Sequence, residues 1–578
     1  MRTSHLIESR PEWVEPYRIP PESAWRELDH NPLVAAILFR RGLQTVDDAF
    51  VFMHPGEQPP LDPYRVPNMD RAVERILRAI AEGETVGIFG DYDVDGITST
   101  AILTQALRHT LGESRVIPRL PDRAEGYGLN HAAIAEFKKA EVSLVIAVDC
   151  GSTDHTHAAC IAGEGMDLVI LDHHRMVDSG PDGAITVSPQ LDSDDMHHDL
   201  TAVGVAYLLI CALAGRGVAV AATATATNDP ATYLDLVALG TVADVAPLVG
   251  VNRQLVSEGI EAIRSGSRIG VSALIESAQL DLTAVTATDI SFSLAPRINS
   301  AGRIGSPQLA FDLMVTGDPG QAKHLAADLE HINFRRKTRS AQVLAEAYDK
   351  ITQQPNWRHL PVFVTHDPGW EPGLVGAVAS RMVEEVRRPV FLFREEAGVL
   401  YGSARSVDGF NLIDSLHGIA SKLTRFGGHS LAAGLTLAAE QLPDLESHVV
   451  EMIRRSGLPI PAPRKLLIDA NLPPEYLTIG TVRELRRMEP FGRGNDQPLL
   501  RIANAELLRY TAIGQDRSHL KIFAKAGGRQ VEAVFWGGAW RSRELVGLRS
   551  INLAGRLEIN IWNGQERLQM VLDDFRAA

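Results

Sequence analysis

The stretch TVGIFGDYDVDGITST, residues 85–100, decides the fold class. Its apolar start, TVGIFG (85–90), predicts a buried strand, and Asp91, Asp93 and Asp95 follow at the start of a helical pattern. A calcium-binding EF-hand loop is excluded, because the twelfth loop position is Ile102 and a strand precedes the acids. Acids favour helix N-termini, but three within five residues repel one another more than a cap requires. The stretch therefore predicts a strand, an acidic turn and a helix.

Two further apolar runs end in residues that can bind metal ions. SLVIAVD ends in Asp149, and DLVILDHH ends in Asp172, His173 and His174. Strands that alternate with helical segments predict a parallel sheet, and ligands of such sheets bind beyond the carboxyl ends of the strands. Carboxylates with one or two histidines suit Mg²⁺ or Mn²⁺, and such a cluster can hold two ions for phosphoryl hydrolysis.

The pattern along the chain predicts an α/β protein with three folded domains and a long connecting helix. Residues 319–352 contain no Gly or Pro after the first two positions, which predicts one continuous helix. Short alternating runs after residue 463 predict a small β-barrel, in which Asn563-Gly564 forms a hairpin turn. The predicted division is an N-terminal extension (1–65), a parallel-sheet catalytic domain (66–318), the connecting helix (319–355), a smaller α/β domain (356–460) and a barrel domain (461–578).

Composition narrows the class of protein. The chain has 578 residues, 45% of them hydrophobic, and a net charge of −15. Three cysteines without a C-x-x-C pair argue against a disulfide framework and against a thiolate zinc site. Without a signal peptide or a long apolar segment, we expect a soluble, cytoplasmic protein that does not bind membranes. The acidic balance disfavours nucleic-acid binding over the whole surface but allows a local basic groove.

Four motifs, GDYDVDG, VDCG, LDHH and GTVADVAPL, resemble those of the DHH phosphoesterase superfamily. Together with PDRAEGYGL, LAPRINSAGRIG, GSARS and FGGHSLAAG, they make residues 30–575 similar to the RecJ family within it. The resemblance implies a DHH domain, a DHHA1-type domain and an OB-like barrel. It also implies a metal-dependent 5′→3′ exonuclease that hydrolyses single-stranded DNA to 5′-mononucleotides in DNA repair and recombination.

The resemblance also implies roles for individual residues, with two divalent cations, Mn²⁺ or Mg²⁺, as cofactors. His174 is expected either near the scissile phosphate or reinforcing the ligand shell, with Asp91 and Asp172 in supporting roles. The implied metal ligands, also counted with His174 as catalytic, are Asp93, Asp95, Asp149, His173 and Asp244. The implied nucleic-acid contacts are Arg123, Arg303, Ser403, Arg405, Gly427, Gly428 and His429.

Several features remain open at this level. The run Arg335, Arg336, Lys337 and Arg339 is either a solvated helix face or a DNA contact. Glu371 stands where the family commonly has His, and would weaken a phosphate contact there. One or two of the barrel aromatics are expected to stack on bases; the candidates are Tyr510, Phe523, Phe535, Trp536 and Trp562.

Two other functions fit the same motifs. The first is a DHH phosphodiesterase for short oligonucleotides or cyclic dinucleotides, although such relatives are generally shorter and lack a C-terminal OB-like domain. The second is an inactive DNA-binding scaffold, which need not keep the ligands. Single-strand-binding protein and a RecQ-type helicase are possible protein partners on which the sequence is silent.

Overall fold

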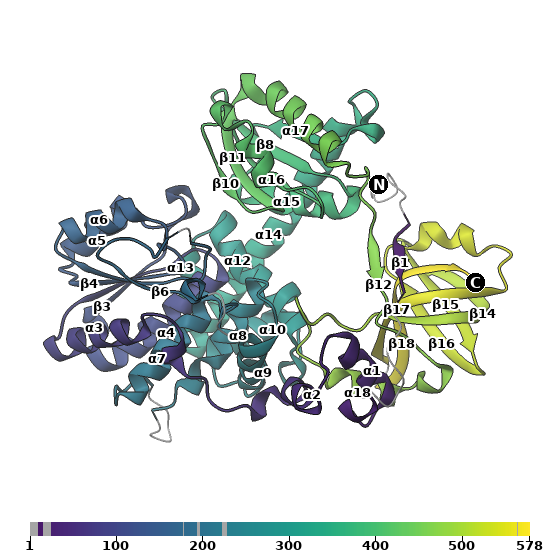
Figure 1. Ribbon diagram of the computed structural model, residues 1–578, viewed down its shortest axis with the longest axis horizontal. Helices are drawn as coiled ribbons and strands as arrows, with labels where there is room; N and C mark the ends of the chain where they lie inside the picture. Colours follow the sequence, from purple (N-terminus) through teal and green to yellow (C-terminus); the bar gives the residue numbers. More distant parts are fainter. Residues whose placement is uncertain (1–9, 16–24, 177, 193–196, 222–227, 563) are drawn as a thin grey trace. The chain divides into compact units, whose positions relative to one another are not determined.

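The computed structural model describes residues 10–578 except 16–24, 177, 193–196, 222–227 and 563 (Figure 1). The chain forms two compact units. Unit 1 comprises Met1–Ala49, Arg336–Arg487 and Pro498–Ala578. Unit 2 comprises Phe50–Arg335 and the short segment Met488–Gln497.

Unit 2 contains the predicted parallel sheet. All its strand pairs are parallel, in the order β3-β2-β4-β5-β6, and Val86 on β2 lies opposite Val116 on β3 and Leu144 on β4. This arrangement confirms the fold class predicted from the alternation of strands and helices. The strands are β2 (Val86–Phe89), β3 (Val116–Arg119), β4 (Leu144–Val148), β5 (Asp167–Leu171) and β6 (Ile185–Val187).

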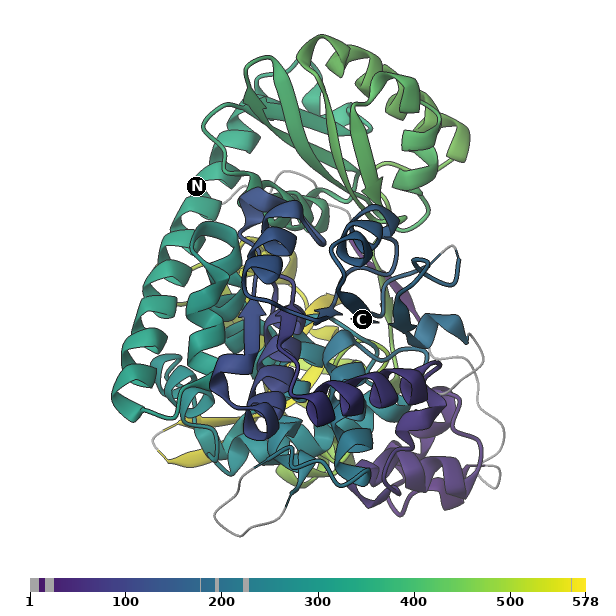
Figure 2. The same ribbon diagram turned by 90° about the vertical axis from the view of Figure 1, so that its left-hand side faces the viewer.

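Helices cover both faces of this sheet, and the strands are apolar on both sides for that reason (Figures 1 and 2). On β4, Val145 and Ala147 join a core with α5 and α6, whereas Leu144, Ile146 and Val148 join the larger core on the other face. The helices on the first face are α5 (His131–Lys139) and α6 (His155–Gly163). The helices on the second face are α3 (Met69–Glu82), α4 (Val94–Leu111) and α7 (Ala202–Gly215).

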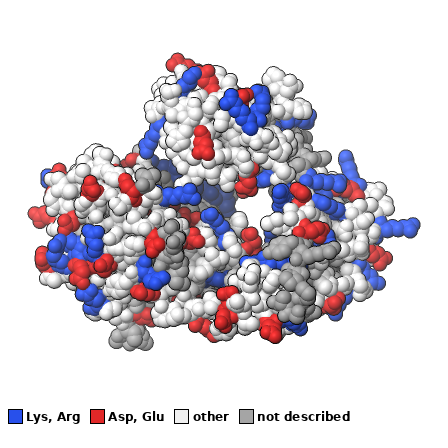
Figure 3. Space-filling view, in the orientation of Figure 1, with Lys and Arg blue, Asp and Glu red and all other residues white. Residues whose placement is uncertain are grey.

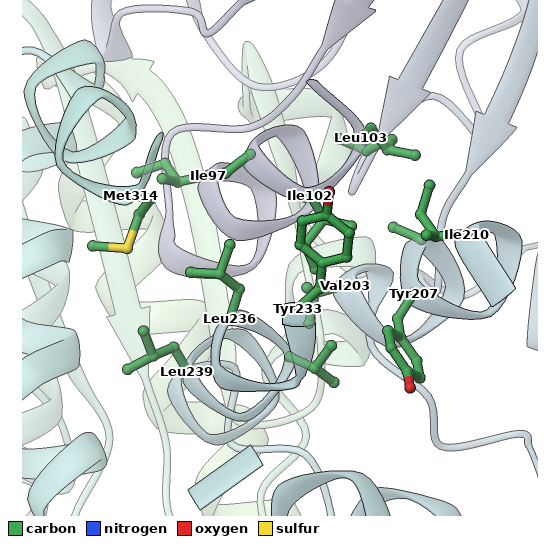
Figure 4. Packing of buried hydrophobic residues seen from close by; sticks show 14 of the residues in the cluster. Ile97, Ile102, Leu103, Val203, Tyr207, Ile210, Tyr233, Leu236, Leu239 and Met314 are labelled. Carbon is green, nitrogen blue, oxygen red and sulfur yellow. The ribbon is translucent and has the colours of Figure 1, made fainter. Parts of the chain in front are cut away.

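The larger core continues into a helical layer beyond α4 and α7. Figure 4 shows Ile97 of α4 packed with Leu236 and Leu239 of α8 and with Met314 of α13. Buried apolar contacts of this kind hold α4, and with it the acidic turn, in one position. The layer consists of α8 (Leu234–Ala243), α9 (Gly250–Arg264), α10 (Ile269–Ser277), α11 (Ala287–Asp289), α12 (Ala295–Ile304) and α13 (Pro307–Val315).

The smaller α/β fold of unit 1 has a mixed sheet in the order β10-β11-β9-β8-β7, with only β7 and β8 parallel. The Gly-rich motif FGGHSLAAG (426–434), for which no strand was predicted, contributes most of β10 and the first three residues of β11. The strands are β7 (Phe363–Asp367), β8 (Val390–Glu396), β9 (Val399–Arg405), β10 (Arg425–Gly428) and β11 (Ala432–Ala438). The helices are α15 (Pro372–Val386), α16 (Leu412–His417) and α17 (Leu442–Ser456).

The C-terminal strands of unit 1 form the predicted barrel. The ring closes because β14 pairs with both β15 and β17, while β16 pairs in parallel with β18. Trp562 lies opposite Gln565, as the predicted two-residue hairpin requires, although Asn563 itself is outside the described residues. The strands are β14 (Leu500–Ile513), β15 (His519–Ala526), β16 (Arg529–Phe535), β17 (Ser550–Trp562) and β18 (Gln565–Ala577), with β13 (Ala470–Asn471) at the edge.

The N-terminal region is more structured than the sequence predicted. The apolar run NPLVAAILFRRG (31–42) predicts one helix, which α1 (Pro32–Arg40) confirms, but α2 (Val46–Met53) was not predicted. Nor was β1 (Glu12–Val14), which pairs with β12 (Lys465–Leu467) and so depends on a partner far along the chain. The helix α18 (Ile479–Arg486) precedes the barrel.

The predicted long helix is confirmed as α14 (Pro319–Thr352), the long teal helix on the left of Figure 2. Within the part of the chain that the structure describes, no helix combines the length and apolar character needed to cross a membrane. Figure 3 shows acidic and basic side chains scattered together over the face that it draws. The low-complexity run VAVAATATATND (218–229), rich in Ala and Thr, lies partly outside the described residues.

Close helix packing makes Gly259 of α9 a test of the unit 2 core. A Cβ atom at Gly259 would lie 2.2 Å from the Leu234 carbonyl oxygen and 2.6 Å from Ala238 Cβ. We expect Gly259→Ala to cost about 1–3 kcal/mol, because α8 and α9 would have to separate. Gly215, in α7, has nothing within 4 Å of such a Cβ, so Gly215→Ala should be neutral or slightly stabilising. Urea unfolding midpoints measure both, and equal midpoints would contradict this packing.

Candidate metal centre and nucleic-acid contacts

The acids and histidines that follow the strands lie together at the carboxyl edge of the parallel sheet. The residues there form three groups of three, and within each group the potential ligand atoms lie within 4.8 Å of one another. Together these groups contain every residue that the resemblance assigned to the metal ions, and also His174 and Asp91. The groups are Asp91, Asp93 and Asp149; Asp149, His173 and His174; and Asp95, His173 and Asp244.

The first turn of α4 fixes two of these carboxylates. Asp93 is the N-cap of α4, and its Oδ1 accepts a hydrogen bond of 3.1 Å from the Gly96 amide, so the capping interpretation holds for this residue. Asp95 is 1% exposed, and its two oxygens accept hydrogen bonds of 2.9 and 2.8 Å from the amides of Ala202 and Val203. These amides begin α7, so Asp95 is held against the N-terminus of a second helix.

Asp149 is held in an unusual backbone conformation directly after β4. Its φ is 61°, in the left-handed region, and its side chain is buried. Oδ1 of Asp149 and Oδ1 of Asp91 are both buried without a hydrogen-bond partner. His173 Nε2 lies 3.3 Å from Asp149 Oδ1, 3.7 Å from Asp95 Oδ2 and 3.8 Å from Asp244 Oδ2. Buried carboxylate oxygens without donors, grouped around an imidazole nitrogen, fit a divalent cation.

Asp172 organises the two histidines rather than joining the metal-ligand groups. Its Oδ1 accepts hydrogen bonds from the amides of His173 (2.8 Å) and His174 (3.1 Å), and Oδ2 accepts one from Ser152 (3.2 Å). His174 Nδ1 lies 2.8 Å from the same Oδ1. This carboxylate therefore orients the His174 ring and fixes the backbone of both histidines, which is consistent with the predicted supporting role.

The pKa values of the cluster record the crowding of its carboxylates. Burial, and then the charges of neighbouring aspartates, raise the pKa of Asp95 and of Asp149 well above the ordinary range. Burial and the charge of Asp93 raise the pKa of Asp91 to about 8 and that of Asp244 to about 7. Each shift disfavours the ionised form, and a bound divalent cation would reverse it.

The two histidines have opposite shifts. Burial and the charge of His174 lower the pKa of His173 to about 4, so His173 is neutral at physiological pH and its Nε2 can bind a metal ion. Burial alone would lower the pKa of His174, but the hydrogen bond and the charge of Asp172 raise it to about 9. His174 is therefore a cation at the edge of the cluster. Neighbours thus give two adjacent histidines different chemistry.

One pocket joins the metal-ligating groups to two of the predicted arginines. Arg123 and Arg303 both line it, and Arg123 lies over the Tyr92 ring at 4.5 Å and donates to the Gly302 carbonyl oxygen at 3.1 Å. The lining is strongly polar, with Asp91, Asp93, Asp95, Tyr127, His174, Asp244 and Asn299 among its members.

Sequence reasoning missed Tyr92, Tyr127 and Asn299. The Tyr127 hydroxyl lies 3.1 Å from the Asp149 carbonyl oxygen and 3.2 Å from His174 Nδ1, so it spans the ends of β4 and β5. Only its place in the quoted PDRAEGYGL motif could have drawn attention to it.

The other predicted nucleic-acid contacts lie in unit 1, around Gly434 of β11. Ser403 of β9 and Gly427 of β10 are both paired with Gly434, and nothing lies within 4 Å of a Cβ at Gly427 or Gly434. Arg405 Nε donates to Ser380 Oγ at 3.0 Å. Gly428 lies opposite Ala433, and the amide of His429 donates to the Ala432 carbonyl oxygen at 2.7 Å.

A glycine of α15 keeps this group accessible. A Cβ at Gly376 would lie 3.1 Å from Arg405 Nη2 and 3.3 Å from Ser403 Oγ, so a larger residue would crowd both polar groups. The three adjoining strands and α15 thus form a cradle of small residues around a hydroxyl and a guanidinium group. Such a cradle lets an anion approach the backbone closely.

Two features left open by the sequence have structural explanations. Arg339 Nε lies 3.0 Å from both carboxylate oxygens of Glu371, and Arg339 Nη2 donates to the Gly369 carbonyl oxygen at 2.5 Å. This pairing joins α14 to the start of α15, so Arg339 has a structural partner. Arg335 and Lys337, in contrast, are exposed.

The barrel aromatics divide into core and surface residues. Phe535 packs edge-to-face against the buried Phe575, with ring centroids 6.1 Å apart. Trp536 is 55% exposed, and Tyr510 is 37% exposed. The guanidinium carbon of Arg509 lies 3.9 Å from the centroid of the Phe523 ring. The side chain of Trp562 is outside the described residues.

Comparisons with known proteins agree with this architecture. Three family models match: the DHH family N-terminal domain over residues 85–241, the DHHA1 domain over 359–455 and the RecJ OB domain over 468–574. The single-stranded-DNA-specific exonuclease RecJ of Bacillus subtilis is 33% identical over 98% of this chain and 71% of its own length. The RecJ of Escherichia coli is 32% identical over 88% of this chain and 90% of its own length.

Solved structures give the same result. The crystal structure of RecJ in complex with Mn²⁺ from Thermus thermophilus is 30% identical, with a TM-score of 0.82 over 98% of this chain and 79% of that chain. The Mg²⁺ complex from the same organism is 29% identical, with a TM-score of 0.77 over 98% of this chain and 78% of that chain. Sequence, fold and domain order agree over nearly the whole chain, which belongs to the RecJ family of exonucleases.

Proposed function

We propose that this protein is a metal-dependent exonuclease that degrades single-stranded DNA in the 5′→3′ direction and releases 5′-mononucleotides. One observation carries the proposal: buried carboxylate oxygens of Asp91 and Asp149 without donors lie within ligand distance of further acids and histidines. The names of the relatives supply the substrate class. We further propose that it acts in DNA repair and recombination in the cytoplasm, with the five-part domain division given above.

The donor set supports two divalent cations, Mn²⁺ or Mg²⁺. Asp149 belongs to two of the three ligand groups, so it is the best candidate for a bridge between two ions. Two such ions stabilise the attacking and leaving oxygens of a phosphoryl displacement. We propose five residues as the ligands that hold them: Asp93, Asp95, Asp149, His173 and Asp244.

The protein's own cations would position the substrate around these ligands. His174, kept protonated by Asp172, can donate a hydrogen bond to a phosphate oxygen. Arg123 and Arg303 line the same pocket and can bind neighbouring phosphate oxygens. In unit 1, Ser403, Arg405 and the Gly427-Gly428-His429 turn would hold the 5′ end of the strand.

The two other candidate functions are less well supported. A phosphodiesterase for short oligonucleotides does not need a RecJ OB domain, whereas this chain matches one over residues 468–574. An inactive scaffold does not need buried, donor-free carboxylates, which are costly in the absence of a cation. Binding to single-strand-binding protein or to a RecQ-type helicase remains a prediction from the resemblance alone.

A direct assay compares substrates. The protein is incubated with Mn²⁺ and either a 5′-labelled single strand of about 30 nucleotides, the matching duplex or a dinucleotide. We expect the label to leave the single strand as a mononucleotide, with the duplex nearly untouched. Faster hydrolysis of the dinucleotide than of the long strand would favour the phosphodiesterase, and no hydrolysis at all would favour the scaffold.

Replacement of Asp149 by Ala should abolish hydrolysis. We expect a rate below about one hundredth of the wild type at saturating Mn²⁺, which corresponds to ~2.7 kcal/mol in the barrier. The fold should persist, because the change removes a buried carboxylate from a crowded acidic cluster. Asp167→Ala is the control, since Asp167 begins β5 at the opposite edge of the same sheet. A rate above about a tenth of the wild type for Asp149→Ala would refute the bridging role.

Stability without metal should fall as pH rises. Folding raises the pKa of Asp244 from 3.8 to about 7 and that of Asp91 from 3.8 to about 8. The folded protein therefore binds more protons than the unfolded chain in this range, and its free energy of unfolding decreases as pH rises. The raised pKa of His174 acts in the same direction.

Thermal unfolding measures this dependence. Between about pH 6.5 and 8.5 we expect Tm to fall in a chelator and the gain in Tm from Mn²⁺ to increase. Asp244→Asn should flatten the pH dependence, because it removes one of the titrating groups. A Tm that rises with pH in the chelator would show that the cluster is ionised without a cation.

Arg405→Ala tests whether Arg405 binds the 5′-terminal phosphate of the strand. We expect kcat/KM to fall about 10- to 100-fold on 5′-phosphorylated strands, because a charge-assisted hydrogen bond is lost, and less on 5′-hydroxyl strands. Apparent Mn²⁺ affinity should not change, since the ligands are in unit 2. Arg394→Ala, on the adjacent strand β8, is the control. An equal loss on both kinds of end would mean that Arg405 contacts the backbone without distinguishing the end.

A further inference from the structure

The short segment Met488–Gln497 belongs to unit 2, although the chain on both sides of it belongs to unit 1. It follows α18 and leads into β14 of the barrel. The sequence MEPFGRGNDQ contains one arginine, Arg493, between two glycines. This segment therefore belongs to the unit that carries the proposed metal ligands, although it immediately precedes the barrel in the sequence.

Buried side chains fix the shape of this segment. Arg253 is 2% exposed and donates hydrogen bonds to the carbonyl oxygens of Met488 (3.0 Å), Glu489 (2.7 Å) and Pro490 (3.3 Å). The Asn495 side chain is 1% exposed and donates 2.8 Å hydrogen bonds to Met488 and Pro490. So many buried hydrogen bonds to one short segment hold it rigidly.

The middle of the segment is fastened to the turn that follows Asp244. The Leu248 amide donates a 2.7 Å hydrogen bond to the Arg493 carbonyl oxygen. Gly492 allows the close approach, since a Cβ there would lie 2.7 Å from Leu248 Cδ1. Gly494, at φ +77°, lies against Pro247. The backbone of Arg493 is thus held next to the turn that follows Asp244, a proposed metal ligand.

The Arg493 side chain, in contrast, is exposed and weakly held. Its guanidinium group donates a long hydrogen bond, of 3.5 Å, to the Val245 carbonyl oxygen. Among the described residues, no carboxylate lies within ion-pair distance of this group. The charge of Arg493 nevertheless lowers the pKa of Asp244 from the value that burial and Asp93 alone would give. The Arg493 backbone is held rigidly while its guanidinium group is exposed, so the side chain is free to bind an anion such as a phosphate.

We propose that Arg493 binds a backbone phosphate of the DNA strand on the 3′ side of the scissile bond. The inference rests on the proposed function. Arg123 and Arg303 line the pocket, whereas Arg493 lies outside it, next to Asp244. The proposed function assigns the 5′ end to Ser403 and Arg405 and the scissile phosphate to the pocket, so a further phosphate contact outside the pocket belongs to the strand on the 3′ side. That strand would pass Arg493 as it leaves the pocket.

Arg493→Gln tests the proposal, with Arg71→Gln as the control. Arg71 is an exposed arginine of α3 in the same unit, so both variants lose one positive charge from that unit. With a single strand of about 30 nucleotides, we expect Arg493→Gln to raise KM about 5- to 20-fold with kcat nearly unchanged. The dependence of log KM on log salt should become shallower by about 0.7, the value for one phosphate contact on a single strand. Arg71→Gln should change neither quantity.

Two further measurements separate this role from its alternatives. A dinucleotide has no phosphate 3′ of the scissile bond, so wild type and Arg493→Gln should hydrolyse it equally. Mn²⁺ binding, measured directly without DNA, should be unchanged or slightly tighter in the variant. Weaker Mn²⁺ binding, or an equal loss on dinucleotide and long strand, would mean that Arg493 only supports the Asp244 turn and would overturn the proposal. Failure of the wild type to degrade single strands would instead refute the proposed function itself.

Discussion

The structure depends on keeping several carboxylates together at one sheet edge against their mutual repulsion. Asp95 shows how this is achieved, because two amides at the start of α7 donate to its oxygens while the apolar core packs α4 against α7 and α8. Hydrogen bonds and burial thus oppose the Coulomb energy. The raised pKa values of Asp91 and Asp149 reflect the burial and the repulsion between carboxylates that these contacts do not offset. A divalent cation is the natural completion of such a site.

The sequence predicted the residues of this sheet edge well where a candidate site residue also marks the end of a strand. Asp149 and Asp172 end apolar runs, and parallel strands bring their carboxyl ends together, so their proximity follows from the pattern alone. Asp244 is different. It is the C-cap of α8, and nothing in its neighbourhood distinguishes it from an ordinary acid at a helix end. Only the resemblance to a family pointed to it, and only the packing of α8 beside α4 brings it to His173.

Other features could not be predicted because they depend on contacts between distant parts of the chain. Tyr127 reaches both Asp149 and His174 from a loop whose sequence suggests only a turn. The segment Met488–Gln497 falls within the predicted barrel domain (461–578), yet Arg253 and Asn495 hold it in unit 2. The strand β1 needs β12 as its partner. Local patterns carry no information on such pairings.

The division of labour between the units has a chemical consequence. Every proposed metal ligand lies in unit 2, whereas Ser403, Arg405 and the glycines near them lie in unit 1. Under the proposed assignment, substitutions around Gly434 and Gly376 would change which strand ends are accepted without altering the proposed metal ligands. Glu371 illustrates this freedom, because its charge is matched by Arg339 within unit 1. Under this assignment, cleavage chemistry and end recognition would depend on two separate sets of residues, one in each unit.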